Sequence, residues 1–212
     1  MIKDLEFIQF FAAKLFHDLA GTLGAVGSAI EFVNSDDPEI RSKALELMEL
    51  SSNQANDKLR FLRYAYGISK YSGDADLSTL RDVCLLLGKD KKINIEFLSP
   101  GSLTNEKSMN VVTGQLILCL AALAKSALIH GGTVKVLWED KGKNSIIVNA
   151  TGHNIKQQTE AHNIINGTSD ATVNPSNIHA YYIKRIIDSR NIKIAIKMDK
   201  ETVSYIIDSK TA

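Results

Sequence analysis

Residues 12–26, AAKLFHDLAGTLGAV, decide how the first part of the chain folds. Apolar or small residues recur around this stretch in alternating steps of three and four, the rhythm of a helix that packs along a seam. The seam consists of Leu5, Ile8, Ala12, Leu15, Leu19, Thr22, Val26, Ala29 and Val33. If Leu5 takes position a of the heptad, His17 falls at f, the position farthest from the seam. The sequence therefore predicts a helix over residues 3–34 with a histidine on its outer face.

Very small side chains follow His17 along the same outer face. Its helix neighbours at steps of three or four residues, or multiples of these, are Ala13, Ala20, Gly21, Gly24 and Ser28. A glycine inside a helix costs about 1 kcal/mol relative to alanine, but it lets another backbone approach closely. We therefore expect a docking strip, formed by these five residues, that ends at a nucleophile. On spacing alone, the alternative remains open that His17 is only a solvated residue and that the glycines pack against a second domain.

A second long helix follows a short turn. Asp37 is a good N-cap and Pro38 suits the first helical position, and the helix extends to about Gly67. Its seam has the same steps: Ala44, Met48, Ser51, Ala55, Leu59, Leu62 and Tyr66. Two antiparallel helices cannot bury seams of this length on both sides, so we expect a homodimer whose hairpins form a four-helix bundle. The alternative is a hairpin that packs on the rest of its own chain.

The remainder of the chain mixes helices and strands. Residues 67–76 are polar and lack periodicity, which predicts a linker between a hairpin domain over residues 1–72 and a second domain over residues 73–212. Helices are predicted over residues 77–87, 111–129, 157–165 and 177–189, and strands over residues 93–98, 133–138, 145–148, 192–198 and 202–207. Helices that cover a sheet rich in antiparallel strands define an α+β fold.

Composition excludes several classes of function. The 212 residues carry a formal net charge of +1, so charge indicates neither nucleic acid nor a membrane surface as a partner. No secretory signal or membrane span is visible, and we expect a cytoplasmic protein. Cys84 and Cys119 lie in apolar segments and are expected to be reduced core residues. The histidines show no metal-ligand spacing, so no metal site is expected.

His17-Asp18-Leu19-Ala20-Gly21-Thr22-Leu23 resembles the histidine box of two-component sensor kinases, which usually reads His-Glu/Asp-Leu-Arg-Thr-Pro-Leu. Ala20, Gly21 and Thr22 depart from its last part. In that family the histidine lies on the outer face of the first helix of a dimerising hairpin. The order of elements after the hairpin is similar to that of the kinase ATP-binding domain. The resemblance implies a dimeric helical hairpin followed by a histidine-kinase ATPase-like α/β sandwich domain.

The nucleotide motifs of that family are degenerate in this sequence. The helix over residues 115–130 lacks the asparagine that holds magnesium, and Ala150 stands where the adenine-reading aspartate is expected. Asn154 replaces the second glycine of the same box, and residues 173–177 contain no glycine. An acid that reads adenine, a magnesium ligand and phosphate-cradling glycines are the chemical minimum for such a site. We therefore expect no ATP binding and no cofactor of the protein's own.

A kinase-like hairpin with an intact histidine and a degenerate nucleotide domain resembles the ChpT-type histidine phosphotransferases. Three sequence segments are also similar to that family: Lys14-Leu-Phe-His17-Asp-Leu, Ala44-Leu-Glu-Leu and residues 59–65. The resemblance implies that His17 takes a phosphoryl group from one receiver domain, such as that of a hybrid histidine kinase, and passes it to another response regulator. Asp18 would orient the ring or stabilise its proton, and Mg²⁺ would belong to the receiver. Residues expected to dock the partner are Phe10, Ala13, Lys14, Ala20, Gly21, Gly24, Ser28, Arg60 and Arg63.

Other interpretations of the same residues remain. Asp18 can be a solvated helix acid, and Arg60 and Arg63 can be solubilising charges. The chain can be a non-catalytic dimeric scaffold or inhibitor that binds kinases or receivers, and an inert His17 would favour that function. An active histidine kinase with an unusual nucleotide site is a weaker alternative, because the motifs are missing. A helical-hairpin adaptor with no link to phosphorelays is the weakest alternative.

Overall fold

The computed structural model describes residues 2–67, 74–88, 92–98, 108–139, 145–168 and 172–208. The chain divides into two compact units, residues 1–62 and residues 63–212. The predicted boundary between residues 72 and 73 falls in the segment 68–73, which lies outside the described residues. The last turn of the second helix belongs to the second unit, because it bonds to helices there as described below.

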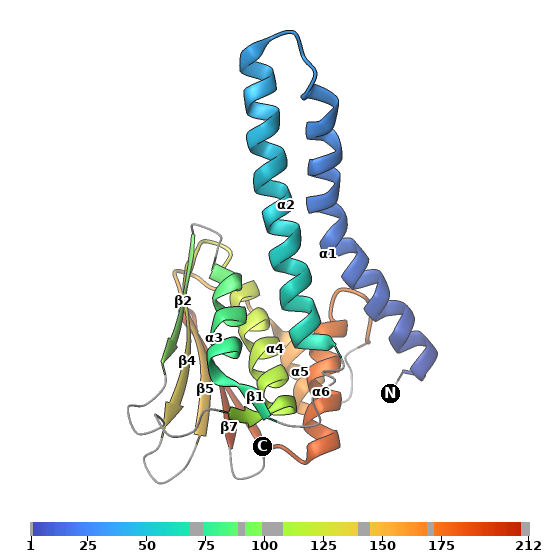
Figure 1. The fold of residues 1–212 in the computed structure, drawn as a ribbon. Helices are drawn as coiled ribbons and strands as arrows, with labels where there is room; N and C mark the ends of the chain where they lie inside the picture. Colours follow the sequence, from blue (N-terminus) through green and yellow to red (C-terminus); the bar gives the residue numbers. More distant parts are fainter. Residues whose placement is uncertain are drawn as a thin grey trace. The chain divides into compact units, whose positions relative to one another are not determined.

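Two long helices joined by a short turn form the first unit (Figure 1). Helix α1 spans Asp4–Phe32 and helix α2 spans Pro38–Tyr66. The Asp37 carboxylate accepts hydrogen bonds from the backbone N–H groups of Glu39 at 2.8 Å and Ile40 at 3.4 Å, which satisfies donors that a helix start leaves unpaired. The predicted antiparallel hairpin, with its cap at Asp37, is confirmed.

The predicted seams are buried only in part. Thr22 and Ala29 of α1 and Ala44, Ser51 and Ala55 of α2 are buried as expected. Leu5, Ile8 and Leu59 are exposed in the single chain, so their burial against a second hairpin stays a prediction. One helix covers one side of its neighbour, so a lone hairpin leaves part of its apolar surface in water.

The second unit is built around a five-stranded sheet with the strand order β2-β4-β5-β7-β6. Strand β2 pairs parallel to β4, and the other neighbours are antiparallel. The strands are β2 (Ile93–Leu98), β4 (Gly132–Glu139), β5 (Ser145–Thr151), β6 (Ile194–Met198) and β7 (Thr202–Asp208). Helices α3 (Leu77–Leu85), α4 (Val111–Ala127), α5 (Thr159–Asn166) and α6 (Ile178–Arg190) lie on one face of the sheet (Figure 1). The predicted α+β class is confirmed.

Two short strands were missed. Strands β1 (Asp74–Asp76) and β3 (Ser108–Asn110) form a separate antiparallel ladder, although neither is among the strands predicted from the sequence. Strands of this length carry no alternating pattern that sequence reasoning can detect. A 3₁₀ turn, Leu86–Gly88, extends α3.

The core lies between the sheet and α4. Strand β5 alternates between buried and half-buried side chains, because successive residues of a strand point to opposite faces. Helix α4 is buried along most of its length, as its apolar sequence predicts. Cys84 and Cys119 are free thiols in this core, and burial raises the pKa of Cys84 to about 12. In the described part of the chain, no helix is both long and apolar enough to cross a membrane.

Candidate functional site

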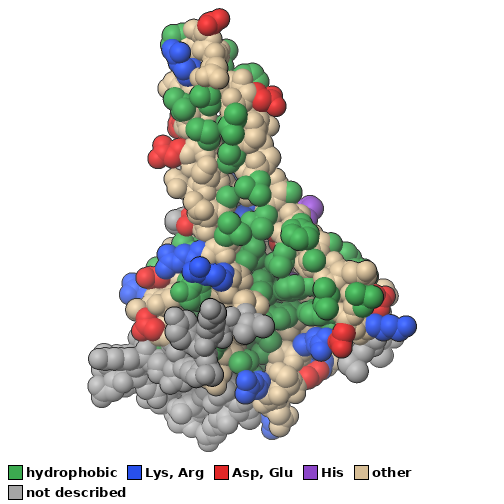
Figure 2. All heavy atoms as spheres, turned by 45° about the vertical axis from the view of Figure 1, so that its right-hand side comes forward, with side chains coloured by type: hydrophobic (Ala, Val, Ile, Leu, Met, Phe, Trp, Pro, Cys, Tyr) green, Lys and Arg blue, Asp and Glu red, His purple; other side chains and the backbone are tan. Residues whose placement is uncertain are grey.

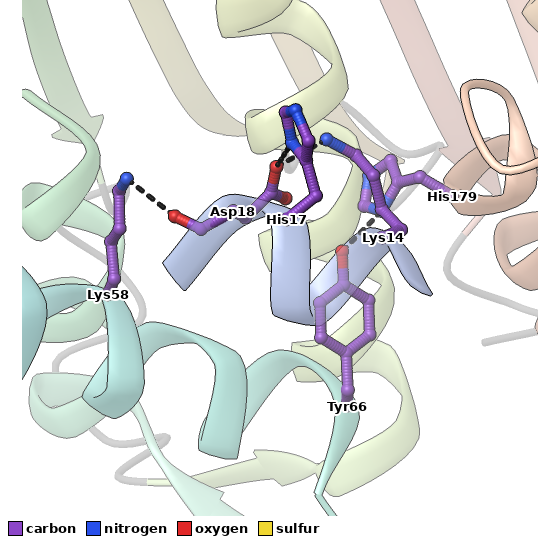
Figure 3. Close-up of polar contacts among 6 residues, drawn as sticks. All are labelled: Lys14, His17, Asp18, Lys58, Tyr66 and His179. Carbon is purple, nitrogen blue, oxygen red and sulfur yellow. Dashed lines mark hydrogen bonds and ion pairs between the residues drawn. The ribbon is translucent and has the colours of Figure 1, made fainter. Parts of the chain in front are cut away.

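His17 lies in the middle of α1 with 85 % of its side chain exposed. Its Nδ1 atom is 3.5 Å from Oδ1 of Asp18, and the same oxygen accepts a hydrogen bond of 2.6 Å from Nζ of Lys14. Figure 3 shows the imidazole and the ammonium converging on this one carboxylate. The site is therefore an open imidazole with a carboxylate and an ammonium group on the side of Nδ1.

Helix geometry brings these three side chains together. Lys14 stands three residues before His17 and four before Asp18, and both separations place side chains on one helix face. Asp18 and Lys14 are each 35 % exposed, so their ion pair is partly shielded from water. The Asp18 carboxylate lies on the Nδ1 side of the ring, so a proton on Nδ1 would face it and Nε2 would keep its lone pair.

A lysine from the second helix reaches the same segment. Nζ of Lys58 donates a hydrogen bond of 2.8 Å to the backbone carbonyl oxygen of Asp18 (Figure 3). This contact ties α1 to α2 one residue from His17. Sequence reasoning missed Lys58, because a side-chain bond to a backbone atom 40 residues away leaves no periodic signal.

The docking strip is open. Ala13, Ala20, Gly21, Gly24 and Ser28 are all exposed. A Cβ added at Gly21, Gly24 or Gly27 would meet no atom within 4 Å. Packing around these positions therefore gives no reason for glycine, and the role of the strip in docking stays a prediction.

The remaining predicted docking residues lie on both units. Phe10 is half-buried on α1, and Arg60 is exposed on the part of α2 that belongs to the first unit. Arg63 belongs to the second unit, and its guanidinium lies 5.6 Å from the centre of the Tyr64 ring. Their placement beside His17 remains a prediction.

Ordinary packing fills the positions of the expected nucleotide motifs. Ala150 is fully buried in β5, paired with Val134 and Val203. A Cβ on Gly152 would lie 2.6 Å from the carbonyl oxygen of Gly131, so this glycine serves the close approach of two backbones. Asn154 adopts a positive φ of 49°, a conformation that asparagine tolerates.

A buried polar network connects α4, α5 and β7. The Gln158 amide donates to the Leu123 carbonyl at 3.0 Å and to Ser126 Oγ at 2.6 Å. Its oxygen accepts a hydrogen bond of 3.1 Å from the Tyr205 hydroxyl, which also lies 3.0 Å from Nε2 of His162. Burial lowers the pKa of His162. The neutral side chains of this network therefore satisfy one another's hydrogen-bond donors and acceptors.

A second histidine contact anchors the last turn of α2 within the second unit. The Tyr66 hydroxyl is hydrogen-bonded to Nδ1 of His179, whose Nε2 lies 2.8 Å from the carbonyl oxygen of Cys119. The Gln115 amide donates a hydrogen bond of 2.8 Å to the carbonyl oxygen of Gly67. Both ring nitrogens of His179 are engaged, so this histidine has a structural role.

The described residues contain no group of three or more histidine, cysteine, aspartate or glutamate side chains that could hold a metal ion.

A family model described as the histidine phosphotransferase C-terminal domain matches residues 79–202, more than half of the chain. The chain therefore belongs to the histidine phosphotransferase family. The matched domain follows a hairpin that carries His17. This combination agrees with the ChpT-type histidine phosphotransferases, which the sequence resembles. No curated protein sequence matches the chain.

The chain is similar to solved structures. A bacterial phosphotransferase superposes with a TM-score of 0.81 at 15 % identity, and the alignment covers 98 % of each chain. The histidine kinase AdeS of Acinetobacter baumannii reaches a TM-score of 0.44 at 14 % identity, covering 91 % of this chain and 93 % of its own. The predicted order, a helical hairpin followed by an α/β domain, is confirmed, and the first of these structures shares that fold.

Proposed function

We propose that this protein is a phosphorelay intermediate in two-component signalling. His17 takes a phosphoryl group from an aspartyl phosphate of one receiver domain and passes it to the receiver of another response regulator. One observation carries the proposal: an exposed imidazole has its Nδ1 beside a carboxylate, which leaves Nε2 open to a partner. Family membership supports phosphotransfer as the general activity.

The chemistry needs little from this chain. The lone pair of Nε2 attacks phosphorus, the P–O bond to the receiver aspartate breaks, and the aspartate carboxylate leaves with that electron pair. Asp18 faces the proton on Nδ1 and stabilises the cationic ring that forms. Positioning and charge stabilisation account for most of phosphoryl transfer, and an apo site often has longer hydrogen bonds than the reacting complex. Mg²⁺ and the acids that bind it would belong to the receiver.

The docking strip would admit a helix of the receiver. Its five residues are exposed, and its glycines have open space where a side chain would stand. A bare helix surface that ends at the nucleophile lets the partner's backbone approach closely. Phe10, Lys14, Arg60 and Arg63 would flank the bound receiver.

The active form would be a homodimer. Phe16, Leu23 and Ile30 of α1 are exposed and stand seven residues apart, and Ile40 and Leu47 repeat that step on α2. Figure 2 shows hydrophobic side chains along the surface of the hairpin. A stripe that recurs every seven residues is typical of a helix that packs against another helix. A second hairpin that covers these stripes would complete a four-helix bundle.

The second unit would act without ATP. Ala150 supports this proposal, because it offers no carboxylate to read adenine and its side chain is buried in the sheet.

The decisive experiment uses a receiver domain loaded with labelled phosphate. It is mixed with the wild-type protein, with His17→Ala and with the matched control His153→Ala, whose histidine is also exposed. Transfer of an acid-labile, base-stable label to the wild type and to His153→Ala, but not to His17→Ala, is the expected result. A chase with a second, unlabelled receiver should then remove the label.

Two outcomes would contradict the proposal. If none of several receivers labels the wild type, the protein is a binding-only scaffold. If labelled ATP alone phosphorylates His17, the protein is a kinase after all. Sedimentation of the unlabelled protein tests the homodimer independently.

A further inference from the structure

We propose that Lys14 neutralises the Asp18 carboxylate so that the site can hold a phosphoryl group on His17. This inference rests on the proposed function, because it concerns the phosphorylated state of His17. It assigns Lys14 a role in positioning and charge compensation, in addition to its place in the expected docking surface.

The Asp18 carboxylate has opposite effects on the free and the phosphorylated His17. Asp18 Oδ1 lies 3.5 Å from Nδ1 of His17, and in the proposed function this carboxylate orients the ring for attack through Nε2. Once Nε2 carries a phosphoryl dianion, the same carboxylate is a like charge on the other side of the imidazole ring. It also favours a positive charge on the ring, and a cationic ring releases the phosphoryl group more readily. The residue that helps the ring to react would therefore weaken the product.

Lys14 is placed to remove this conflict. Its ammonium group binds the oxygen that faces the imidazole, at 2.6 Å. Because both contacts share that atom, the ammonium is at most about 6 Å from Nδ1, a range over which charges interact strongly.

Helix stability gives a weaker reason for this pair. An acid four residues before a lysine is the favourable order on a helix, as in the exposed Glu39–Lys43 pair of α2. In the Lys14–Asp18 pair the lysine comes first, and both side chains are partly buried. The Lys184–Asp188 pair of α6 has the same order, so the order alone assigns no role; what distinguishes the Lys14–Asp18 pair is that its carboxylate oxygen also lies 3.5 Å from Nδ1 of His17.

Lys58 does not share this role. Its ammonium bonds to the backbone carbonyl of Asp18 and not to the carboxylate. Figure 3 shows Lys58 reaching the backbone from α2, whereas Lys14 lies with the imidazole and the carboxylate. The charge on the carboxylate is thus compensated from within α1.

The predicted consequence is a shorter lifetime of the phosphohistidine without Lys14. Hydrolysis breaks the P–N bond, and a cationic ring is a better leaving group than a neutral one. An uncompensated Asp18 carboxylate beside Nδ1 stabilises the cationic ring, so the phosphoryl group should leave faster without Lys14. Lys14→Met should shorten the half-life about five-fold, whereas Lys14→Arg should keep it within about two-fold because the charge is retained.

The test uses phosphoramidate as the donor, so that no receiver is needed. Nε2 forms a bond to phosphorus, the P–N bond of phosphoramidate breaks, and ammonia leaves with that electron pair. The donor is then removed, and the phosphohistidine half-life is measured by ³¹P NMR in the wild type, Lys14→Met, Lys14→Gln and Lys14→Arg. Lys43→Met is the matched control, because it removes a lysine from another ion pair of the same spacing. Circular dichroism verifies the helix content of each variant.

An Asp18→Asn background separates compensation from a structural effect. If Lys14 acts by neutralising Asp18, Lys14→Met should change the half-life less than about two-fold once the carboxylate is gone. Equal half-lives for wild type and Lys14→Met would overturn the proposal, as would an equal loss in Lys14→Arg. Failure of phosphoramidate to load His17 would also overturn it.

If the proposed function is wrong but the role of Lys14 is right, the experiments should give a different result. In that case the loaded wild type would keep its phosphate in the presence of every receiver, while the half-lives would still depend on Lys14.

Discussion

Lys58 of α2 donates a 2.8 Å hydrogen bond to the backbone carbonyl of Asp18 in α1. The contact ties the two helices together beside His17. Lys58→Met should therefore lower the free energy of unfolding of the hairpin by about 0.5–1 kcal/mol, the low end for a hydrogen bond because this one is exposed to water. Urea unfolding followed by circular dichroism measures the change.

Lys43→Met serves as the comparison for Lys58→Met. Its ion pair with Glu39 is local and exposed, so its loss should cost no more than about 0.5 kcal/mol. Equal effects of the two substitutions would show that the cross-helix bond adds nothing to stability.

The hairpin shows which features a sequence can predict. Alternating steps of three and four placed His17 on the outer face, and Asp37-Pro38 marked the start of α2, because helix periodicity and capping are local properties. The contact of Lys58 with Asp18 depends on the relative alignment of two helices, which local pattern does not encode.

The second unit shows the same limit. Strand β5 could be predicted from its alternation, but the bonds of Gln158 to Leu123 and Tyr205 join segments that are distant in sequence. The end of α2 is a similar case. Its bonds to Gln115 and His179 make the last turn part of the second unit, although the helical pattern continues through it.

Gly24 offers two substitutions with different outcomes. A Cβ at this position meets no atom within 4 Å, so Gly24→Ala should stabilise the helix by about 0.5–1 kcal/mol. Gly24→Leu should leave the hairpin folded and dimeric but should block docking, because a large side chain would occupy the docking strip. Transfer from a labelled receiver and sedimentation of the protein measure the two effects. Transfer at an unchanged rate in Gly24→Leu would disprove the docking strip.

Gly152 should respond to alanine in the opposite direction. Its added Cβ would lie 2.6 Å from the Gly131 carbonyl oxygen and 2.8 Å from Leu128 Cδ2. Since the backbone must shift to relieve this overlap, Gly152→Ala should destabilise the second unit by about 1–3 kcal/mol. Thermal unfolding of this variant beside Gly24→Ala compares a crowded glycine with an open one. A melting temperature at or above that of the wild type would contradict the packing role of Gly152.

His162 should make the second unit sensitive to acid. Burial lowers the pKa of His162 below the ordinary value of 6.5, and its Nε2 lies 3.0 Å from the Tyr205 hydroxyl. The unfolded chain therefore takes up a proton near pH 6.5, whereas the folded chain does so only at a lower pH. Stability is retained above pH 6.5 and is lost as the pH falls from there to the lowered pKa of the folded state. Urea unfolding between about pH 7.5 and about pH 5 measures this loss. His162→Gln should flatten the profile, whereas His153→Gln, which replaces an exposed histidine, should leave it unchanged. An equally steep profile for His162→Gln and the wild type would assign the acid sensitivity to other groups.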